Sequence, residues 1–240
     1  MVNISRHKSQ LGNNGFTIIK NVFSDEQIEQ LLKLIDQTDI SRASFRKSSD
    51  LFAIRQFLKE VPDINPQVFN NDFICLLGAI LGHDYFVVKS IYFDKPKQSN
   101  WFVAYHQDLT IAVDRKTELE GYNQWTVKQE QFSVQPPLAI LKSIYTVRIH
   151  LDDTDENNGA LKVIPGSHLK DIYRSEDIDW SVETEENCIV PKGGIMIMRP
   201  LLQHSSSRTT NNKRRRVIHI EFCNKELHNK LKWIERINLE

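Results

Sequence analysis

The sequence predicts an α+β fold that is mainly β, with helices near the N-terminus and an antiparallel sandwich or closed double sheet after them. Three observations predict it. Apolar residues at helical spacing are confined to the first third of the chain, strand-like runs follow without regularly alternating helices, and Pro, Gly and Asn turns separate those runs. Parallel βαβ units are disfavoured because they need a helix between successive strands. At 240 residues the chain fits a single domain, 1–240.

The expected elements begin with a short strand at 15–20 and a helix that opens at a capping box of Ser24 and Gln27. Further helices are expected at 49–60 and 68–81, so that a helical part covers about 24–82. The β core should cover about 85–223. Its strand-like runs are rich in Val, Ile, Tyr and Phe, and they lie at 85–93, 101–107, 138–151, 160–164, 194–198 and 215–223.

Composition argues against several classes of function. Lys plus Arg equal Asp plus Glu at 31 each, so the chain lacks the net charge that proteins binding nucleic acids or anionic membranes usually carry. No apolar run is long enough to span a membrane, and the N-terminal residues lack the apolar segment of a secretion signal. Cys75, Cys188 and Cys223 are odd in number and far apart, which disfavours disulfides and a cysteine zinc site. We expect a cytoplasmic protein that acts on small molecules.

The stretch NWFVAYHQDLTIAV, at 100–113, is typical of a strand, yet it carries two metal-binding side chains. Successive strand residues alternate between faces, so His106 and Asp108 are expected to share one face. A third donor can come from His204 in PLLQHSSS, which follows the run GGIMIM. Two histidines and one carboxylate leave three positions of an octahedral ion open, as in non-haem Fe(II) oxygenases. The sequence therefore indicates a metal centre of these three residues.

A simpler interpretation has to be weighed, because a lone HxD motif in a strand is usually a coincidence. The chain has a second HxD, formed by His150 and Asp152 in RIHLDD, and spacing alone leaves His150, Asp152 and His204 open as a ligand set. Asp152, however, opens the acidic loop DDTDENNG, where a solvated turn explains it. His168 in PGSH is typical of a turn residue bonded to the backbone.

Arg215 favours the first ligand set. Fe(II) oxygenases of this kind usually consume a 2-oxo acid, whose far carboxylate needs a fixed cation, and the planar fork of arginine gives two parallel hydrogen bonds to a carboxylate. In RRRVIHIEF, alternation places Arg215, Val217 and His219 on one face, whereas Arg214 and Arg216 lie on the other. The alternative is that all three arginines lie at a solvated strand start.

With HQD, a later HSS and an arginine eleven residues beyond that histidine, the chain resembles the phytanoyl-CoA dioxygenase family of Fe(II)/2-oxoglutarate-dependent oxygenases. The resemblance also covers GFTIIKNVFSDEQIEQL, FDKPKQSNW, NNGALKVIPGSH and RRRVIHIEF. It implies a double-stranded β-helix core, a jelly-roll or cupin-like fold, with the helices packed outside. It also implies that His106, Asp108 and His204 are the iron ligands.

The resemblance implies a 2-oxoglutarate site as well. Arg215 matches the arginine that binds the C5 carboxylate of 2-oxoglutarate, and Ser206 matches a hydroxyl position that often assists it. Arg148 aligns with an inward position near the co-substrate that is often aromatic in relatives, which suggests a polar or anionic contact here.

Substrate contacts are expected from loops and from inward-facing strand residues. The long polar segment 115–137 is expected to be a loop or flap, from which Trp125 and Lys128 would close over the pocket. Lys89 is expected to face inward from its strand, with a solvated edge lysine as the alternative. Arg148 and Lys89 together favour a small polar or carboxylate-bearing substrate, with neither a nucleic acid nor a membrane as partner.

The implied reaction is hydroxylation of a C–H bond of a small metabolite, with Fe(II), 2-oxoglutarate and O2, stimulation by ascorbate, and release of succinate and CO2. Asp108 favours hydroxylation over halogenation, because halogenating relatives have a small residue there. Two alternatives stay open. A zinc-dependent cupin-like hydrolase or isomerase would leave Arg215 without a role, and a non-catalytic barrel-fold binding module would have lost its chemistry.

Overall fold

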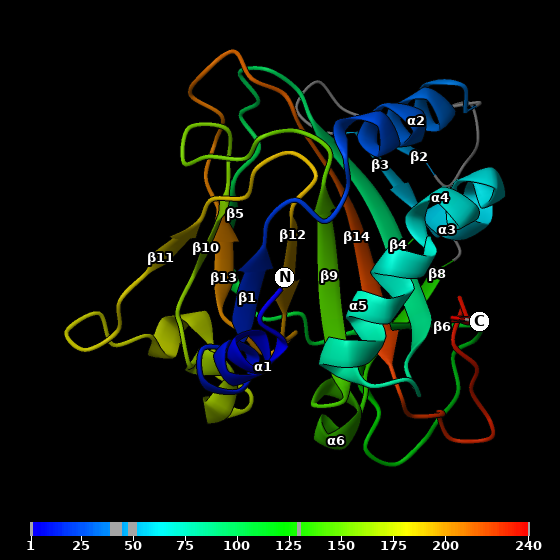
Figure 1. Ribbon diagram of the computed structural model, residues 1–240. Coiled ribbons are helices and arrows are strands. Elements are labelled where there is room, and N and C mark those ends of the chain that lie inside the picture. Colours follow the sequence, from blue (N-terminus) through cyan, green and yellow to red (C-terminus); the bar gives the residue numbers. More distant parts are fainter. Residues whose placement is uncertain (1, 39–44, 48–51, 129–130, 240) are drawn as a thin grey trace.

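The computed structural model describes residues 2–38, 45–47, 52–128 and 131–239. It confirms the predicted class, because most of its elements are antiparallel strands and its longer helices lie near the N-terminus (Figure 1). The α-helices are α1 (Ile4–Asn13), α2 (Asp25–Asp36), α3 (Phe57–Glu60), α4 (Asn65–Val68), α5 (Asn71–Leu81) and α6 (Leu138–Leu141). The 3-10 helices are η1 (Pro62–Ile64), η2 (Ser167–Lys170) and η3 (Ser175–Asp177). Within the described ranges no helix has both the length and the apolar character needed to cross a bilayer.

The largest sheet has eight strands in the order β1-β12-β9-β14-β4-β3-β2, with β15 also paired to β4. Its strands are β1 (Phe16–Ile19), β2 (Phe45–Lys47), β3 (Phe52–Arg55), β4 (Phe86–Lys95), β9 (Ile144–His150), β12 (Ile195–Met198), β14 (Arg215–Cys223) and β15 (Ile237–Asn238). Every pairing in it is antiparallel. The strand β14 lies between β9 and β4, far from both in sequence, which gives the crossed strand order of a jelly roll.

A second sheet has four strands in the order β11-β10-β13-β5, and a third has the order β6-β8-β7. The second contains β5 (Val103–His106), β10 (Leu161–Val163), β11 (Glu186–Cys188) and β13 (His204–Ser206). The third contains β6 (Ile111–Val113), β7 (Asn123–Lys128) and β8 (Gln131–Gln135). In Figure 1 the four-stranded sheet lies to the left of β9 and β14, whereas α2, α3 and α4 lie toward their right and α5 is drawn in front of β14. No strand of one sheet pairs with a strand of another among the described residues.

The outer face of the large sheet is apolar and packs under the helices. The helix α2 begins at the predicted capping box, where Ser24 and Gln27 satisfy each other's backbone N–H groups. Its apolar residues Ile28, Leu31 and Ile35 recur at helical spacing and are buried in one cluster with the outward residues of β9, β12 and β14. Burial of each such side chain contributes about 2 kcal/mol, so this cluster is a main source of stability.

The inner face of the same sheet is polar, because alternation turns every second residue of the central strands away from the helices. The strand β9 contributes Arg148 and His150 to this face, and its register aligns Arg148 with His219 of β14. The register of β14 with β4 then aligns Arg215 with Lys95. A buried apolar cluster that includes Phe16 of β1, Met196 of β12 and Val163 of β10 fills the space toward the second sheet. The polar inner face is therefore enclosed between the two sheets.

Two expected elements are wrong because tertiary contacts override local pattern. The part of 49–60 that the structure describes is a strand, β3, followed by the one-turn helix α3, and β3 pairs with β4. Residues 49–51 lie outside the described residues. The run 138–151 begins with the helix α6 before β9. In both segments the apolar residues suit either a helix or a strand, and pairing along β4 and β14 decides.

The expected loop or flap at 115–137 is only partly found, since residues 115–122 contain no helix or strand but β7 and β8 follow them. These strands pair with each other, and β8 pairs with β6. Tyr122 and Val134 supply the buried side of this small sheet and pack with residues of β4 and β6.

Candidate metal centre

Three metal-binding side chains come together where β5 lies beside β13. One nitrogen or oxygen atom from each of His106, Asp108 and His204 lies within 4.8 Å of the others. The Nε2 atom of His106 is 3.9 Å from Oδ1 of Asp108, and Nε2 of His204 is 3.7 Å from Oδ2. Within the described part of the chain this is the one group of its kind, so His150, Asp152 and His204 do not form a ligand set.

The two histidines are positioned by strand pairing and the carboxylate by the segment that follows β5. His106 is the last residue of β5, His204 is the first of β13, and the register of these antiparallel strands aligns them. Asp108 lies beyond the end of β5, and its backbone N–H donates to the carbonyl of Pro200 at 2.8 Å. The expectation that one strand face carries both His106 and Asp108 is therefore wrong, because the chain has already left the strand at Asp108.

Both imidazoles are turned so that Nε2 faces the carboxylate. The Nδ1 atom of His106 lies 2.9 Å from the carbonyl oxygen of Ala104, and Nδ1 of His204 lies 2.9 Å from that of Leu202. A carbonyl oxygen can only accept, so each Nδ1 carries the hydrogen and each Nε2 keeps its lone pair. Backbone bonds of this kind fix the ring orientation of metal-binding histidines in proteins.

The protonation states also suit a metal ion. Burial lowers the pKa of His204 to about 4, although the nearby Asp108 acts in the opposite direction. Burial alone would raise the pKa of Asp108, but the imidazole of His204, the ammonium of Lys89 and the other nearby imidazoles hold it well below its usual range. At neutral pH His204 therefore offers a neutral nitrogen and Asp108 an ionised oxygen, the forms that bind a divalent cation. The donor set fits such an ion.

A hollow of about 190 Å³ opens beside these three side chains. We call it the metal hollow, and its polar lining includes His106, Asp108, His204, Arg148, Ser206 and Arg215. The two histidines and Ser206 come from the four-stranded sheet, and Asp108 comes from the segment after β5. The two arginines come from the inner face of the large sheet. The hollow thus has a metal-binding wall and a cationic wall.

Arg215 is a buried cation with no acidic partner among the described residues. Arg215 is 6% exposed, and one terminal nitrogen of its guanidinium donates to the carbonyl oxygen of Gly159 at 2.5 Å. The hydroxyl of Ser206 donates to the same oxygen at 3.0 Å, and Nε of Arg215 has no hydrogen-bond partner. Burial and the charge of Arg148 lower the pKa of Arg215 to about 9. An unpaired buried guanidinium is costly, so this wall favours an anionic ligand.

The family comparison bears directly on this arrangement. The model of the family described as Phytanoyl-CoA dioxygenase (PhyH) matches residues 11–217, which include both walls of the metal hollow. The chain belongs to the phytanoyl-CoA dioxygenase family. A comparison with curated proteins finds no match.

Three solved structures have a similar fold. HygX from Streptomyces hygroscopicus, solved with nickel and 2-oxoglutarate bound, is 12% identical with a TM-score of 0.66, over 98% of this chain and 97% of that chain. EctD from S. alaskensis, in its apoform, is 14% identical with a TM-score of 0.71, over 93% and 79%. The epimerase SnoN, in complex with Fe3+, alpha ketoglutarate and nogalamycin RO, is 12% identical with a TM-score of 0.66, over 92% and 83%. At these identities the likeness shows the fold.

In this PhyH family member, Arg148 begins a chain of buried polar groups. A terminal nitrogen of its guanidinium lies 3.1 Å from Nδ1 of His219, and its Nε has no hydrogen-bond partner. Arginine can only donate, so Nδ1 of His219 accepts and its Nε2 donates to Glu221 at 3.2 Å. Glu221 in turn accepts from Nζ of Lys89 at 2.6 Å. Sequence reasoning placed His219 on the inner face but missed it and Glu221 as neighbours of the site.

Lys89 faces inward, and its ammonium donates to Glu221, the last of these buried polar groups. Burial alone would lower the pKa of Lys89, but Glu221 and, further off, Asp108 raise it above its usual value. Lys89 is therefore a cation at neutral pH, and Glu221 is its immediate counter-ion. Of the four hydrogen-bonded groups, Arg148 is the one that both lines the metal hollow and carries a full positive charge.

Lys95 is a second buried lysine near the arginines, and sequence reasoning missed it. The residue has 0% exposure, its Nζ donates to the carbonyl oxygen of Ser207 at 2.5 Å, and it is the register partner of Arg215. Burial and the charge of Arg215 lower the pKa of Lys95 to about 7. The signal that could have found it is alternation along β4, because Lys89 and Lys95 lie an even number of residues apart.

The other HxD motif and His168 have local partners. Nδ1 of His150 lies 2.7 Å from the hydroxyl of Thr154, and Asp152 forms an ion pair with Arg216 at 2.7 Å. Nε2 of His168 lies 3.2 Å from a backbone carbonyl oxygen of α1. Each of these side chains thus has a structural role outside the metal hollow.

A second and larger hollow of about 390 Å³ adjoins the metal hollow, and His106 lines both. We call it the outer hollow, and its lining includes Tyr105, His106, Gln124, Gln135, Tyr173 and Arg174. Trp125 lines neither hollow, since it packs against the buried cluster of the third sheet. Lys128 is the last residue of β7, and its side chain lies outside the described residues.

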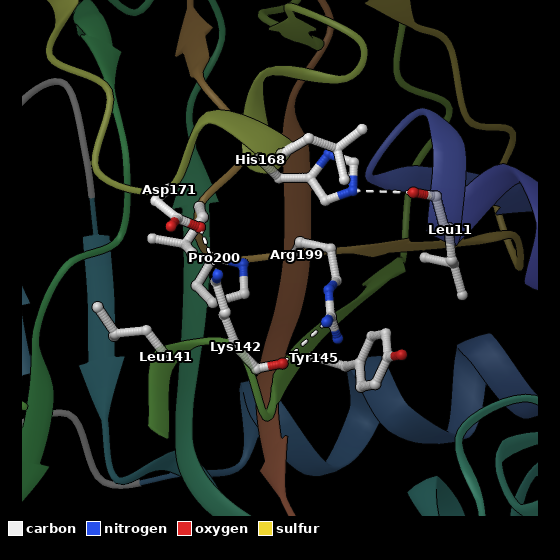
Figure 2. Close-up of a pocket in the computed structure, with 11 residues that line it drawn as sticks. Leu11, Leu141, Lys142, Tyr145, His168, Asp171, Arg199 and Pro200 are labelled. Carbon is white, nitrogen blue, oxygen red and sulfur yellow. Dashed lines mark hydrogen bonds and ion pairs between the residues drawn. The ribbon is translucent and has the colours of Figure 1, made fainter. Parts of the chain in front are cut away.

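A third hollow of about 280 Å³ lies between α1 and the segment that follows β12, apart from His106 (Figure 2). Figure 2 shows Lys142 turned toward Asp171, with which it forms an ion pair at 2.5 Å. The guanidinium of Arg199 lies 4.2 Å from the ring centre of Tyr145 and donates to the carbonyl oxygen of Lys142 at 2.8 Å. This hollow contains no group of metal-binding side chains and takes no part in the metal centre.

Proposed function

We propose that this protein is an Fe(II)- and 2-oxoglutarate-dependent oxygenase that oxidises a small molecule and releases succinate and CO2. One observation carries the proposal: a metal-binding triad and an unpaired buried arginine face each other across one hollow. The membership of the phytanoyl-CoA dioxygenase family supports it. HygX, with nickel and 2-oxoglutarate bound, offers a structural parallel for such a hollow.

In this proposal His106, Asp108 and His204 hold the iron through two Nε2 atoms and a carboxylate oxygen. Bound iron and its co-substrate supply the O2 chemistry, and the protein supplies binding and orientation. Arg215 and Ser206 bind the distal carboxylate of 2-oxoglutarate, and this contact removes the cost of an unpaired buried charge.

Arg148 is the second cation of the metal hollow, and we propose that it too faces the co-substrate. Its free Nε–H and its buried charge suit a carboxylate or oxo group. His219 holds the guanidinium in place from the other side through the 3.1 Å contact with Nδ1. The positive charge of Arg148, which in the sequence favoured a carboxylate-bearing substrate, would thus bind the co-substrate instead.

Among the reactions of this class we propose hydroxylation of a C–H bond. Asp108 would offer a carboxylate to the iron where halogenating relatives have a small residue, which disfavours halogenation. The relatives in structure include a protein described as an epimerase, so analysis of the product decides between hydroxylation and other oxidations. Ascorbate should stimulate turnover by keeping iron in the Fe(II) state.

The residues expected to contact substrate take different places in this proposal. We propose that Lys89 acts through Glu221, which binds its ammonium. Trp125 lines neither hollow, so its neighbours on β7 are the better candidates. A contact from Lys128 stays a prediction. On the cysteine pattern of the sequence we propose the cytoplasm as the compartment.

Two other functions use the same side chains differently. A zinc-dependent hydrolase or isomerase would need the triad but would leave Arg215 and Arg148 without an anionic partner. A non-catalytic binding module would have no need of two histidines held with Nε2 toward a carboxylate. The unpaired arginines therefore favour the oxygenase.

The test is 2-oxoglutarate turnover by the purified protein with Fe(II), ascorbate and a metabolite extract. We expect O2 consumption, succinate release and a product heavier by one oxygen atom, as followed by mass spectrometry. The Asp108→Ala variant should lose all three signals. Turnover with zinc in the absence of 2-oxoglutarate would support the hydrolase or isomerase instead.

A further inference from the structure

We propose that the outer hollow binds a neutral, hydroxyl-rich ring compound and that the amides of Gln124 and Gln135 select it. This inference rests on the proposed function, because it names the substrate class of the same site. Four properties of the outer hollow support it: its position, its charge, its free hydrogen-bonding groups and a strained residue in its wall.

The outer hollow is placed for a substrate of the metal centre. His106 lines it and also lines the metal hollow, so a molecule bound there lies against a metal-binding side chain. The side chain of His106 is 40% exposed, whereas that of His204 is 8% exposed. The metal centre is therefore reached from the side of His106. The volume of about 390 Å³ is in the range of small-molecule sites in proteins.

The two hollows differ in charge. Arg148 and Arg215 make the metal hollow cationic. The acidic and basic residues of the outer hollow are Glu176 and Arg174, which lie 3.6 Å from each other as an ion pair. A charged ligand would lose its hydration there without gaining an unpaired counter-ion. The outer hollow therefore favours an uncharged ligand.

The outer hollow is nevertheless rich in hydrogen-bonding groups, because four glutamines line it. They are Gln107, Gln124, Gln135 and Gln203. The Nε2 groups of Gln107 and Gln203 donate to backbone carbonyls, so these two glutamines hold neighbouring segments together. The side chains of Gln124 and Gln135 bond to no described residue. A primary amide both donates and accepts, which matches a hydroxyl group and matches neither a carboxylate nor an ammonium fully.

The aromatic lining suits the carbon skeleton of a ring compound. The hydroxyl of Tyr105 donates to Glu185 at 2.8 Å, and that of Tyr173 donates to the carbonyl oxygen of Asp177 at 2.9 Å. Because these hydroxyls already have partners, the two tyrosines offer chiefly their ring surfaces to a ligand. Apolar contact from the rings and hydrogen bonds from the two free amides together fit an aliphatic ring that carries hydroxyls.

The backbone at Gln124 is an independent sign of function. Its φ is 56°, in the left-handed region that a non-glycine residue enters at a cost in free energy. The residue lies in a register shift of β7 against β8, between Asn123 and Thr126. Bulges of this kind turn a side chain away from the regular alternation, and strained residues cluster at binding sites. We infer that the bulge places the amide of Gln124 in the outer hollow.

The test compares three sets of hexose-sized probes on the anaerobic protein loaded with metal and 2-oxoglutarate. The sets are neutral methyl glycosides and cyclic polyols, uronic acids, and amino sugars, and binding is measured by calorimetry before succinate release is followed in air. We expect the best neutral probe to bind at least about tenfold more tightly than the best acid or amine. This gain comes from two amide hydrogen bonds together, each of which is worth up to about tenfold in affinity.

The variants separate binding by the amides from damage to the fold. The double variant Gln124→Ala/Gln135→Ala should weaken the neutral probe by about tenfold or more, whereas 2-oxoglutarate binding stays unchanged. Asn123→Ala is the matched control, because Asn123 is an exposed amide on the same strand that does not line the outer hollow. It should change affinity by less than about twofold. Gln124→Gly removes the amide and relieves the backbone strain, so it should weaken the probe while the unfolding temperature stays or rises.

Three results would overturn the inference: tighter binding of an acid or amine, full affinity in the double variant, or no binding of any set to protein that does bind 2-oxoglutarate. The last result leaves the proposed function standing. If the protein binds no 2-oxoglutarate, the proposed function and this inference fail together.

Discussion

The imidazoles of His106 and His204 lie opposite each other in neighbouring antiparallel strands, with ring centres 4.3 Å apart. Each ring bonds through Nδ1 to the backbone carbonyl oxygen of the residue two positions earlier in the sequence. The same local bond thus turns both Nε2 atoms toward Asp108. The site is preorganised for a metal by its backbone, which keeps the cost of ordering the ligands low on binding.

Removal of the carboxylate should abolish metal binding without unfolding the protein. Asp108→Ala deletes one of three donors, so we expect the affinity for Ni(II), a non-reactive probe, to fall by more than about 100-fold. Added Ni(II) should raise the unfolding temperature of the wild type by mass action and leave that of the variant unchanged. Asp152→Ala, in the other HxD motif, is the control and should keep the response. Equal thermal shifts for wild type and Asp108→Ala would contradict the metal centre.

Loss of Arg215 should weaken 2-oxoglutarate binding while metal binding is retained. Arg215→Met removes a charge-assisted pair of hydrogen bonds, and we expect a loss of about 10- to 100-fold in calorimetry with the Ni(II) protein. Arg215→Lys keeps the charge but not the planar fork, so its affinity for 2-oxoglutarate should lie between those of the wild type and Arg215→Met. Arg214→Met is the matched control, because Arg214 pairs with Asp94 on the other face of the sheet. A loss of similar size in both methionine variants would argue against the assigned roles.

The buried pair of Lys89 and Glu221 should be strongly coupled. Lys89→Met leaves the carboxylate of Glu221 without its closest cation, so we expect a loss of about 3 kcal/mol in the free energy of unfolding. Glu221→Gln alone should also destabilise, because it leaves the ammonium of Lys89 without a counter-ion. The double variant should lose less than the sum, with a coupling energy of about 1 to 3 kcal/mol in urea unfolding. Additive losses would show that the 2.6 Å contact carries little energy.

Glu235 should make stability depend on pH. Burial raises its pKa from the ordinary 4.5 to about 7, even though the backbone N–H and hydroxyl of Ser90 donate to it at 2.5 and 2.6 Å. The folded protein therefore holds this proton more tightly than the unfolded chain. The stability it contributes is fully present below pH 4.5 and is lost as the pH rises through about 7.

The matched variant for this effect is Glu235→Gln, which keeps the shape without the charge. We expect similar stability of the two proteins at pH 5, and at pH 8 the variant should be more stable by about 2 kcal/mol. Urea unfolding at several pH values from 5 to 8 measures the difference. Parallel stability curves would show that Glu235 is ionised in the fold throughout this range.

Much of the fold followed from local pattern. The capping box at Ser24 and the spacing of Ile28, Leu31 and Ile35 indicated α2 and its buried face, because helix starts and amphipathic faces are encoded within a few residues. The segments 49–60 and 115–137 were wrong for the opposite reason. Their short apolar and polar runs suit more than one structure, and strand pairing with β4 and β6 decided between them.

The sequence by itself determined which donors the site contains and which arginine faces inward. Residue type and spacing singled out His106, Asp108 and His204 but left His150 and Asp152 open, and the position of Arg215 and the family resemblance favoured the first set. Alternation separated Arg215 from Arg214 because side chains on a strand have a period of two. These properties are local, so no knowledge of distant contacts was needed.

Only the tertiary structure decided what surrounds those donors. The register of β14 against β4 brings Lys95 beside Arg215, and its register against β9 brings Arg148 to His219. The segment after β5 places Asp108, and Gln124 lies in a register shift of β7 against β8. Strand register joins residues that are far apart in the chain, and the packing of whole sheets fixes it, so no short stretch of sequence contains this information.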